Sequence, residues 1–307
     1  MIALFFTLAL LVATLSTANA APSKNWSDCL GINPDHSIRG CTNIIKSGEE
    51  SGKNRSIAYY NRGITYSNKG DYNRAITDYD MSIKLNPKDA DVYLNRGFAY
   101  RMKVQYDRAI ADYTQAIKLN PKYESAYYNR GFAYAKKGDY NSAIANYDMS
   151  IKLNPKDATA YFNRGLAYRK KVQFDRAIAD YTQAIKLNPK YASAYFNRGF
   201  AYTKMDDYDS AFADFDQVTK LKPNNATAYF NRGVAHENKG RYDRAIADYD
   251  KVIKLIPKGA DAYGNRGLAN EKIGQRNKAI TDFRKALELR PGDRVGTSGL
   301  KRLGETP

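Results

Sequence analysis

The sequence is poor in the residues that metal sites and disulfide-rich folds require. Its 307 residues include two cysteines, two histidines and one tryptophan. Two cysteines cannot form a four-cysteine zinc site. His36 and His236 lie 200 positions apart, with no cysteine or carboxylate at the spacing of metal ligands. The sequence therefore predicts no metal site and no cofactor, and the composition excludes collagen-like and disulfide-dense proteins.

The sequence also lacks the motifs that most enzymes carry. We find no glycine-rich nucleotide loop, no nucleophile elbow and no metalloprotease helix motif. The 21 glycines are mostly regularly spaced along the chain and are not clustered. No nucleophile or acid–base pair is distinct from its surroundings. We therefore predict a protein with no catalytic residues and no small-molecule substrate.

Long hydrophobic runs are absent, apart from one at the N-terminus. Residues 2–15 form an uncharged, mostly apolar run that is shorter than a membrane span of about 20 residues. Ala18-Asn19-Ala20 follows, and small residues in this pattern are typical of a signal-peptidase site. We expect a signal peptide over 1–20, export to the periplasm or medium, and no transmembrane segment after cleavage. An uncleaved anchor is the alternative, since the run has no Lys or Arg before it.

The chain is rich in positive charge and in tyrosine. Its 49 Lys and Arg against 32 Asp and Glu give a formal charge of +17, and the first 20 residues contribute no charged side chain to it. The sequence contains 26 tyrosines, which is too much aromatic content for a disordered basic tail. A folded, basic protein is expected.

A repeat of 34 residues determines the domain organisation. The tripeptide Asn-Arg-Gly begins seven times at this interval, from Asn61 to Asn265, and a proline recurs at the same interval from Pro87 to Pro291. A gap-free period of this kind is typical of repeat proteins. With Ser56 as position 1, the repeats are 56–89, 90–123, 124–157, 158–191, 192–225, 226–259 and 260–293.

Each repeat reads as two amphipathic helices. Positions 4, 8 and 11 share one helical stripe, positions 20, 21, 24 and 28 share another, and the proline at position 32 ends the second helix. The aromatic, glycine, alanine and proline pattern resembles the tetratricopeptide repeat (TPR). This resemblance implies an all-α fold, a right-handed α-solenoid of seven helical hairpins. The polar, glycine-rich tail 294–307 is expected to be flexible.

Residues 21–55 resemble a degenerate half-repeat. Residues 34–47 match the second helix of a repeat, which places Cys41 at the inward-facing position 24, and Cys29 lies 12 residues earlier. In an exported chain we expect these two cysteines to form a disulfide that closes the half-repeat. The segment resembles the N-terminal part of certain exported bacterial TPR proteins.

The family resemblance also indicates which positions line a concave groove. Position 6 is asparagine in all seven repeats, and a row of asparagines is similar to those that bind peptide backbones in some repeat proteins; local bonding within the stack is the alternative. Position 5 is mostly aromatic, and its side chains are either exposed anchors or packing between neighbouring first helices. Positions 12 to 14 are basic in the middle of the chain, and Glu237 and Glu271 end this run. The basic residues are Arg101, Lys103, Lys136, Lys137, Arg169, Lys170, Lys171 and Lys204. The candidate groove residues are Asn61, Asn95, Asn129, Asn163, Asn197, Asn231, Asn265, Tyr60, Tyr128, Phe162, Phe196, Phe230, Arg101, Lys136, Arg169, Lys170 and Lys204.

Two further patterns overlie the repeat. Position 7 is always arginine and position 23 is aspartate in every repeat but the third, which has Asn146, so we expect these two positions to pair. Residues 70–137 and 138–205 match at 55 of 68 positions, which indicates a duplicated two-repeat block. The duplication either has no functional meaning or presents the same groove chemistry twice.

The sequence thus predicts a non-enzymatic scaffold that binds an extended, acidic peptide or protein segment. The alternative is a binder of polyanions or of the cell-envelope surface. Nucleic acid is disfavoured as a partner, because 11 lysines occupy repeat positions 29 and 33, where they complement the negative ends of the second helices instead of forming one patch.

Overall fold

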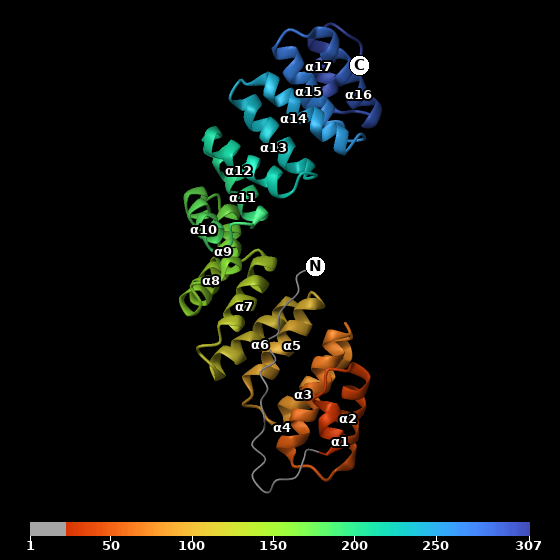
Figure 1. Cartoon of the computed structure of the whole chain (residues 1–307), viewed down its shortest axis with the longest axis vertical. Helices are drawn as coiled ribbons and strands as arrows, with labels where there is room; N and C mark the ends of the chain where they lie inside the picture. The colour runs from red at the N-terminus through yellow and green to blue at the C-terminus, as the bar shows by residue number, and fades with distance from the viewer. Residues whose placement is uncertain (1–22) are drawn as a thin grey trace. The chain divides into compact units, whose positions relative to one another are not determined.

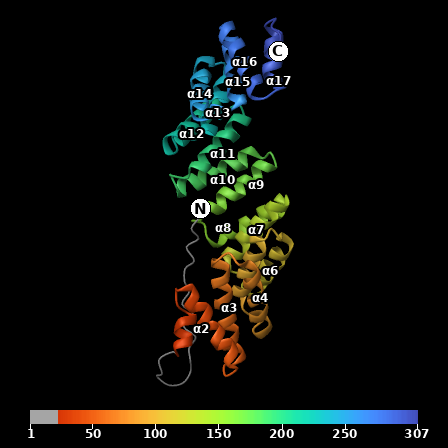
Figure 2. The same cartoon turned by 90° about the vertical axis from the view of Figure 1, so that its right-hand side faces the viewer.

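A computed structural model describes residues 23–307, so the predicted signal peptide lies outside the described residues. The described chain contains α-helices and no strand (Figures 1 and 2). It divides after Ala99 into two compact units. The helices are α1 (Lys24–Cys29), α2 (Pro34–Ser47), α3 (Gly52–Asn68), α4 (Tyr72–Leu85), α5 (Ala90–Met102), α6 (Tyr106–Leu119), α7 (Glu124–Lys137), α8 (Tyr140–Leu153), α9 (Ala158–Lys170), α10 (Phe174–Leu187), α11 (Ala192–Lys204), α12 (Tyr208–Leu221), α13 (Ala226–Asn238), α14 (Tyr242–Leu255), α15 (Ala260–Lys272), α16 (Arg276–Leu289) and α17 (Arg294–Arg302).

The seven repeats form helical hairpins, as expected. Odd-numbered helices α3–α15 are the first helices and even-numbered helices α4–α16 are the second. Each second helix ends at the leucine of position 30, two residues before the proline, because the residue before a proline is steered out of the helical region. In the unit Tyr100–Pro307, each first helix packs on the second helix of its own repeat and on that of the repeat before (Figure 1). This stacking of hairpins confirms the predicted α-solenoid class.

Glycine and alanine allow the two helices of a hairpin to approach closely. A Cβ atom built on Gly165 would lie 2.7 Å from the ring of Tyr181. Ala177, which begins the stripe of the second helix, is completely buried. Position 24 is the aromatic centre of each hairpin, and its side chains are at most 1% exposed. They are Tyr79, Tyr113, Tyr147, Tyr181, Phe215, Tyr249 and Phe283.

The N-terminal half-repeat is present with the predicted disulfide. Helix α2 covers Pro34–Ser47, the range expected from the sequence, and the shorter α1 packs against it. Cys29 and Cys41 are bonded to each other, and both are buried with Ile44. Trp26, the only tryptophan of the chain, packs on this cluster. The disulfide therefore ties α1 to α2.

The expected flexible tail 294–307 is corrected by the structure. Residues Arg294–Arg302 form helix α17, which packs on α15 and α16. Leu300 is completely buried, and Gly299 faces the ring of Phe283. The helix forms because the last hairpin would otherwise expose its apolar face, and α17 covers that face as a cap.

The turns between paired helices use the left-handed backbone region at position 15. Glycine occupies this position in four repeats, as at Gly138 with φ of 84°. Val104 and Val172 replace it with φ of 60° and 59°, although a β-branched residue is unfavourable there. Both valines are about two-thirds exposed, at 66% and 69%. Packing therefore does not compensate for this backbone strain.

Among residues 23–307, no helix combines the length and the apolar character that crossing a membrane requires.

Candidate functional site

The predicted pairing of positions 7 and 23 is confirmed. Arg164 donates from Nε to Asp180 at 2.9 Å and from Nη2 to the other oxygen of the same carboxylate at 2.6 Å. Asp180 is buried, whereas Arg164 keeps 19% of its side chain exposed. The equivalent hydrogen bond to Asp248 raises the pKa of the Arg232 guanidinium, which therefore stays charged. The same bidentate pairs are Arg62–Asp78, Arg198–Asp214, Arg232–Asp248 and Arg266–Asp282.

These arginines have a second partner that sequence reasoning missed. Nη1 of Arg164 donates to Asp148 at 2.6 Å, and Asp148 lies at position 25 of the preceding repeat. Arg198 makes the same contact to Thr182 at 2.9 Å. Position 25 is Asp or Thr in six repeats, and this restriction was a signal for the partner. The arginine row therefore links consecutive hairpins and has its charge matched internally.

The asparagine row makes a regular local bond. In every repeat, Nδ2 of the asparagine donates to the backbone carbonyl four residues earlier, as Asn129 does to Ser125 at 2.7 Å. Asn163 also donates from Nδ2 to the hydroxyl of Tyr128 at 2.9 Å. The other five local bonds are those of Asn61, Asn95, Asn197, Asn231 and Asn265. The local bonding expected as the alternative is thus present, and the amide oxygens take no part in it.

The aromatic side chains of position 5 pack inside their own hairpins. The ring of Phe196 lies 5.8 Å from that of Phe215, and the ring of Phe162 lies 4.8 Å from that of Tyr191. All of them remain half-buried. They therefore pack on position 24 of their own repeat and keep part of each side chain accessible. The pairs with position 24 are Tyr60–Tyr79, Tyr128–Tyr147, Phe162–Tyr181, Phe196–Phe215 and Phe230–Tyr249.

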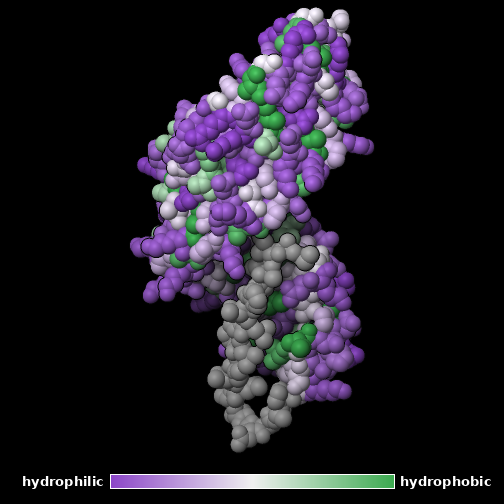
Figure 3. Space-filling view, turned by 45° about the horizontal axis from the view of Figure 1, so that its top comes forward, coloured by the Kyte–Doolittle hydropathy of each residue, from purple (hydrophilic) through white to green (hydrophobic). Residues whose placement is uncertain are grey.

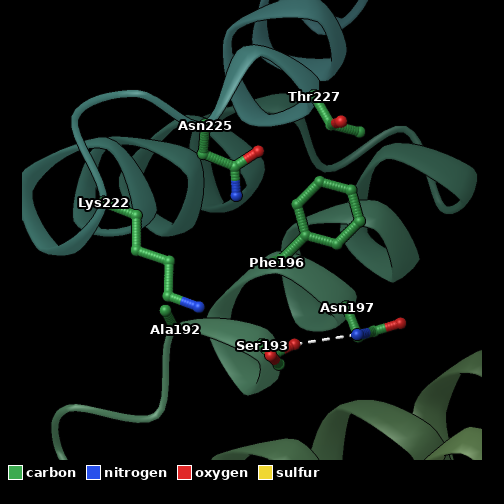
Figure 4. A pocket seen from close by; sticks show the side chains of 7 residues that line it. All are labelled: Ala192, Ser193, Phe196, Asn197, Lys222, Asn225 and Thr227. Atoms are coloured by element: carbon green, nitrogen blue, oxygen red, sulfur yellow. Dashed lines mark hydrogen bonds between the residues drawn. The ribbon is translucent and has the colours of Figure 1, made fainter. Parts of the chain in front are cut away.

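A shallow pocket brings positions 5 and 6 of one repeat together. Its volume is about 220 Å³. Figure 4 shows the ring of Phe196 facing Thr227, and the amide oxygen of Asn197 turned away from the helix carbonyl that its nitrogen binds. The pocket lies between α11, the loop after α12 and the start of α13. Its lining residues are Ala192, Ser193, Phe196, Asn197, Lys222, Asn225 and Thr227.

The basic residues of positions 12 and 13 surround phenylalanines that sequence reasoning did not select. Arg169 Cζ lies 5.2 Å from the centre of the Phe200 ring, and Lys204 Nζ lies 5.5 Å from it. These distances are typical of cation–π contacts. Phenylalanine at position 9 in the second, third and fifth repeats was the available signal. Lys170, the remaining predicted basic residue, is exposed at the end of α9.

The acidic residues that end the basic run are engaged internally. Tyr249 donates from its hydroxyl to Glu237 at 2.8 Å, and burial raises the pKa of the Glu237 carboxyl. Glu271 accepts two hydrogen bonds from Arg302 of α17, at 3.0 and 2.7 Å. Position 12 therefore changes from a half-buried arginine in the second and fourth repeats to a glutamate bonded within the protein in the sixth and seventh.

The predicted site residues are divided between the two compact units. Asn61, Asn95 and Tyr60 belong to the unit that ends at Ala99, and all the others belong to Tyr100–Pro307. Within residues 23–307, no cluster of His, Cys, Asp and Glu could hold a metal ion. On the face shown in Figure 3, hydrophilic residues predominate over this second unit, and apolar residues form small, separate patches.

Comparison with protein families identifies the repeats. Models described as TPR repeat match residues 105–138, 133–172 and 167–206. Models described as tetratricopeptide repeat match 56–89 and 260–293, 201–260, and 79–111. Together these matches span 56–293, the range that the sequence period defined. No curated protein sequence matches the chain.

Solved structures share the fold. A TPR protein fragment from Cytophaga hutchinsonii aligns with a TM-score of 0.67 at 22% identity, over 78% of this chain and 99% of its own. MamA aligns with a TM-score of 0.51 at 30% identity, over 52% of this chain and 93% of its own. YrrB is described as a TPR protein with an unusual peptide-binding site. It aligns with a TM-score of 0.56 at 24% identity, over 62% of this chain and 97% of its own.

Proposed function

Because this chain belongs to the tetratricopeptide-repeat family, we propose that it is a non-enzymatic scaffold that binds an extended, acidic segment of a partner protein. TPR proteins bind protein or peptide partners, which is the general part of this function. The acidic character of the segment and its place along the first helices of the unit Tyr100–Pro307 are specific to this chain.

The observation that carries the proposal is the contrast between two sets of cations. Except for Arg130, the arginines of position 7 are matched by carboxylates, and several lysines of position 14 are too, as in the contact of Lys137 with Asp107. Among the described residues, Lys136, Arg169 and Lys204 form no ion pair. A protein surface with cations held in place and no carboxylate of its own favours an acidic ligand.

The asparagine row supplies backbone recognition. Since Nδ2 is committed to the helix carbonyl, the amide oxygen is the group that can accept a hydrogen bond from a peptide N–H. An extended peptide presents N–H groups at regular intervals, and asparagine oxygens one repeat apart can bind some of them. The structure of YrrB, with its peptide-binding site, supports the idea that this fold can hold a peptide.

The test compares matched peptides and matched variants. An extended peptide containing glutamates and its glutamine counterpart are titrated against the protein by fluorescence anisotropy at two salt concentrations. We expect the glutamate peptide to bind more tightly and to weaken with salt. Asn129→Ala with Asn163→Ala should reduce its affinity at least tenfold, since each lost hydrogen bond costs about 1 kcal/mol. Equal binding of the two peptides, or an unchanged affinity in the double variant, would contradict the proposal.

A polyanion or envelope surface is the second candidate, and one observation favours it. Eleven lysines at repeat positions 29 and 33 are exposed and form no ion pair among the described residues. Lys118→Ala with Lys152→Ala would weaken binding to a polyanion such as polyphosphate and leave the acidic peptide bound. Unchanged polyanion binding in this double variant would contradict the second candidate.

Export remains part of the proposal and is supported by the disulfide. A buried Cys29–Cys41 bond is typical of oxidising compartments outside the cytoplasm. Mass spectrometry of the protein recovered from the exported fraction would test it. We expect the mature protein to begin at Ala21. If the recovered protein still carries residues 1–20, cleavage is contradicted.

A further inference from the structure

The unit Tyr100–Pro307 contains the same aromatic–cation arrangement twice. In the first aromatic–cation site, Arg101 Cζ lies 4.8 Å and Lys136 Nζ 5.3 Å from the centre of the Phe132 ring. In the second site, the corresponding distances to the Phe200 ring are 5.2 and 5.5 Å. The second site consists of Arg169, Phe200 and Lys204. In both, the arginine comes from the end of one first helix and the phenylalanine and lysine come from the next.

The duplicated block retained both sites while other positions diverged. The two copies differ at 13 of their 68 positions, and none of the three residues of the site is among them. The fourth repeat, between the two sites, has Leu166 at position 9. The second repeat has Phe98 there, but position 12 of the repeat before it is Ser67 instead of arginine. The sites therefore recur with the period of two hairpins.

Each site concentrates positive charge beside a neutral ring. Arg169 and Lys204 both lie close to the Phe200 ring, so two positive charges are concentrated around it. The lysine is exposed, and the arginine is half-buried. A guanidinium that faces a ring keeps its N–H groups in the plane at its edge, where a carboxylate can accept them. A carboxylate beside the ring would be attracted by both cations.

We propose that the ligand occupies both aromatic–cation sites at once, with two acidic clusters separated by a short extended spacer. This inference rests on the proposed function and specifies its ligand. Two helix spacings of about 10 Å each place the sites roughly 20 Å apart. An extended chain advances about 3.3 Å per residue, so the two clusters are about six residues apart.

A bivalent ligand binds more tightly than the sum of its parts. Once one cluster is bound, the other is held near its site at an effective concentration in the millimolar range. Loss of one site should then cost about a hundredfold in affinity, although it removes only half of the contacts. Two independent sites would instead lose only about twofold, the statistical factor for one site of two.

Two peptides and three variants test this inference. The first peptide carries two pairs of glutamates about six residues apart, and the second has the same composition with its glutamates in one block. Both are titrated by fluorescence anisotropy at one ionic strength against the wild type, Lys136→Ala, Lys204→Ala and the double variant. Lys118→Ala, on the second-helix edge, is the control for net charge. All substituted side chains are exposed, and a melting curve for each variant checks that it is folded.

We expect the two-cluster peptide to bind the wild type about a hundredfold more tightly than either single variant, and the Lys118→Ala protein to bind like the wild type. The one-block peptide should lose only about twofold in the single variants. If the two peptides bind equally and lose affinity equally, the bivalent arrangement is wrong and the acidic-peptide scaffold stands. If neither peptide binds the wild type while polyphosphate does, the proposed function itself is wrong.

Discussion

Arg130 donates a hydrogen bond from Nε to the amide oxygen of Asn146 at 2.8 Å. In the next repeat the same atoms of Arg164 meet the carboxylate of Asp180. Burial lowers the pKa of Arg130, because this half-buried guanidinium has no carboxylate to offset its desolvation. The third hairpin therefore lacks the ion pair that stabilises its neighbours.

Asn146→Asp should consequently stabilise the protein. The new carboxylate would accept two hydrogen bonds from Arg130, and a bond to a charged group contributes about 1.5 kcal/mol. The matched substitution Asp180→Asn should destabilise the protein by about 3 kcal/mol, since it removes one partner of a buried pair. Urea unfolding measures both. If Asn146→Asp lowers the free energy of unfolding, the interpretation of the arginine row is wrong.

Reduction of the disulfide should loosen the N-terminal half-repeat. Cys29 and Cys41 close a 12-residue interval, and a loop of this size contributes about 3 kcal/mol. Trp26 packs beside the bond and donates to Glu50 at 2.6 Å, so its fluorescence reports on this segment alone. Cys29→Ser with Cys41→Ser should lower the unfolding midpoint followed by tryptophan fluorescence. An unchanged midpoint would show that α1 is held without the bond.

Val104 and Val172 adopt the left-handed backbone conformation, and the strain that this causes can be tested. Val172 has φ of 59° and is 69% exposed, so replacing it with glycine relieves the backbone and loses little packing. Val172→Gly should stabilise the protein by about 1 kcal/mol. Gly138→Val, at the equivalent turn with φ of 84° and open space around it, should destabilise it by a similar amount. Thermal melting of both variants checks whether their shifts have opposite signs.

His236 should make stability depend on pH. It is buried and stacks on Phe212 with ring centres 4.1 Å apart. Burial lowers the pKa of its imidazole, and the attraction of Asp248 at 3.9 Å opposes this only in part. A histidine with a lowered pKa binds protons less readily in the folded state, so its contribution to stability is lost as the pH falls below about 6.5.

His236→Tyr provides the control, since tyrosine stands at the same position in the first five repeats. Melting temperatures measured from pH 7.5 to pH 5 should fall less steeply in this variant than in the wild type. Parallel curves for the two proteins would mean that His236 does not titrate in this range.

Much of the fold and part of the candidate site could be predicted from the sequence. The 34-residue period, the proline at position 32 and the small residues at positions 8 and 20 predicted hairpins with the observed bounds. The pairing of Arg164 with Asp180 was predictable, because both lie in one repeat and every copy shows the same spacing. The disulfide was predictable from two cysteines in a short half-repeat.

Contacts between repeats were decided by the tertiary structure. Which side chain of the preceding hairpin meets Arg164, and which cations meet Phe132 and Phe200, depends on how consecutive hairpins are rotated against each other. The docking of α17 has the same origin, since the tail is polar in sequence and only the exposed face of the last hairpin gives Leu300 a place to be buried. Local sequence determines the helices because their hydrogen bonds are local. Side-chain neighbours across a stack are set by packing, which no single repeat specifies.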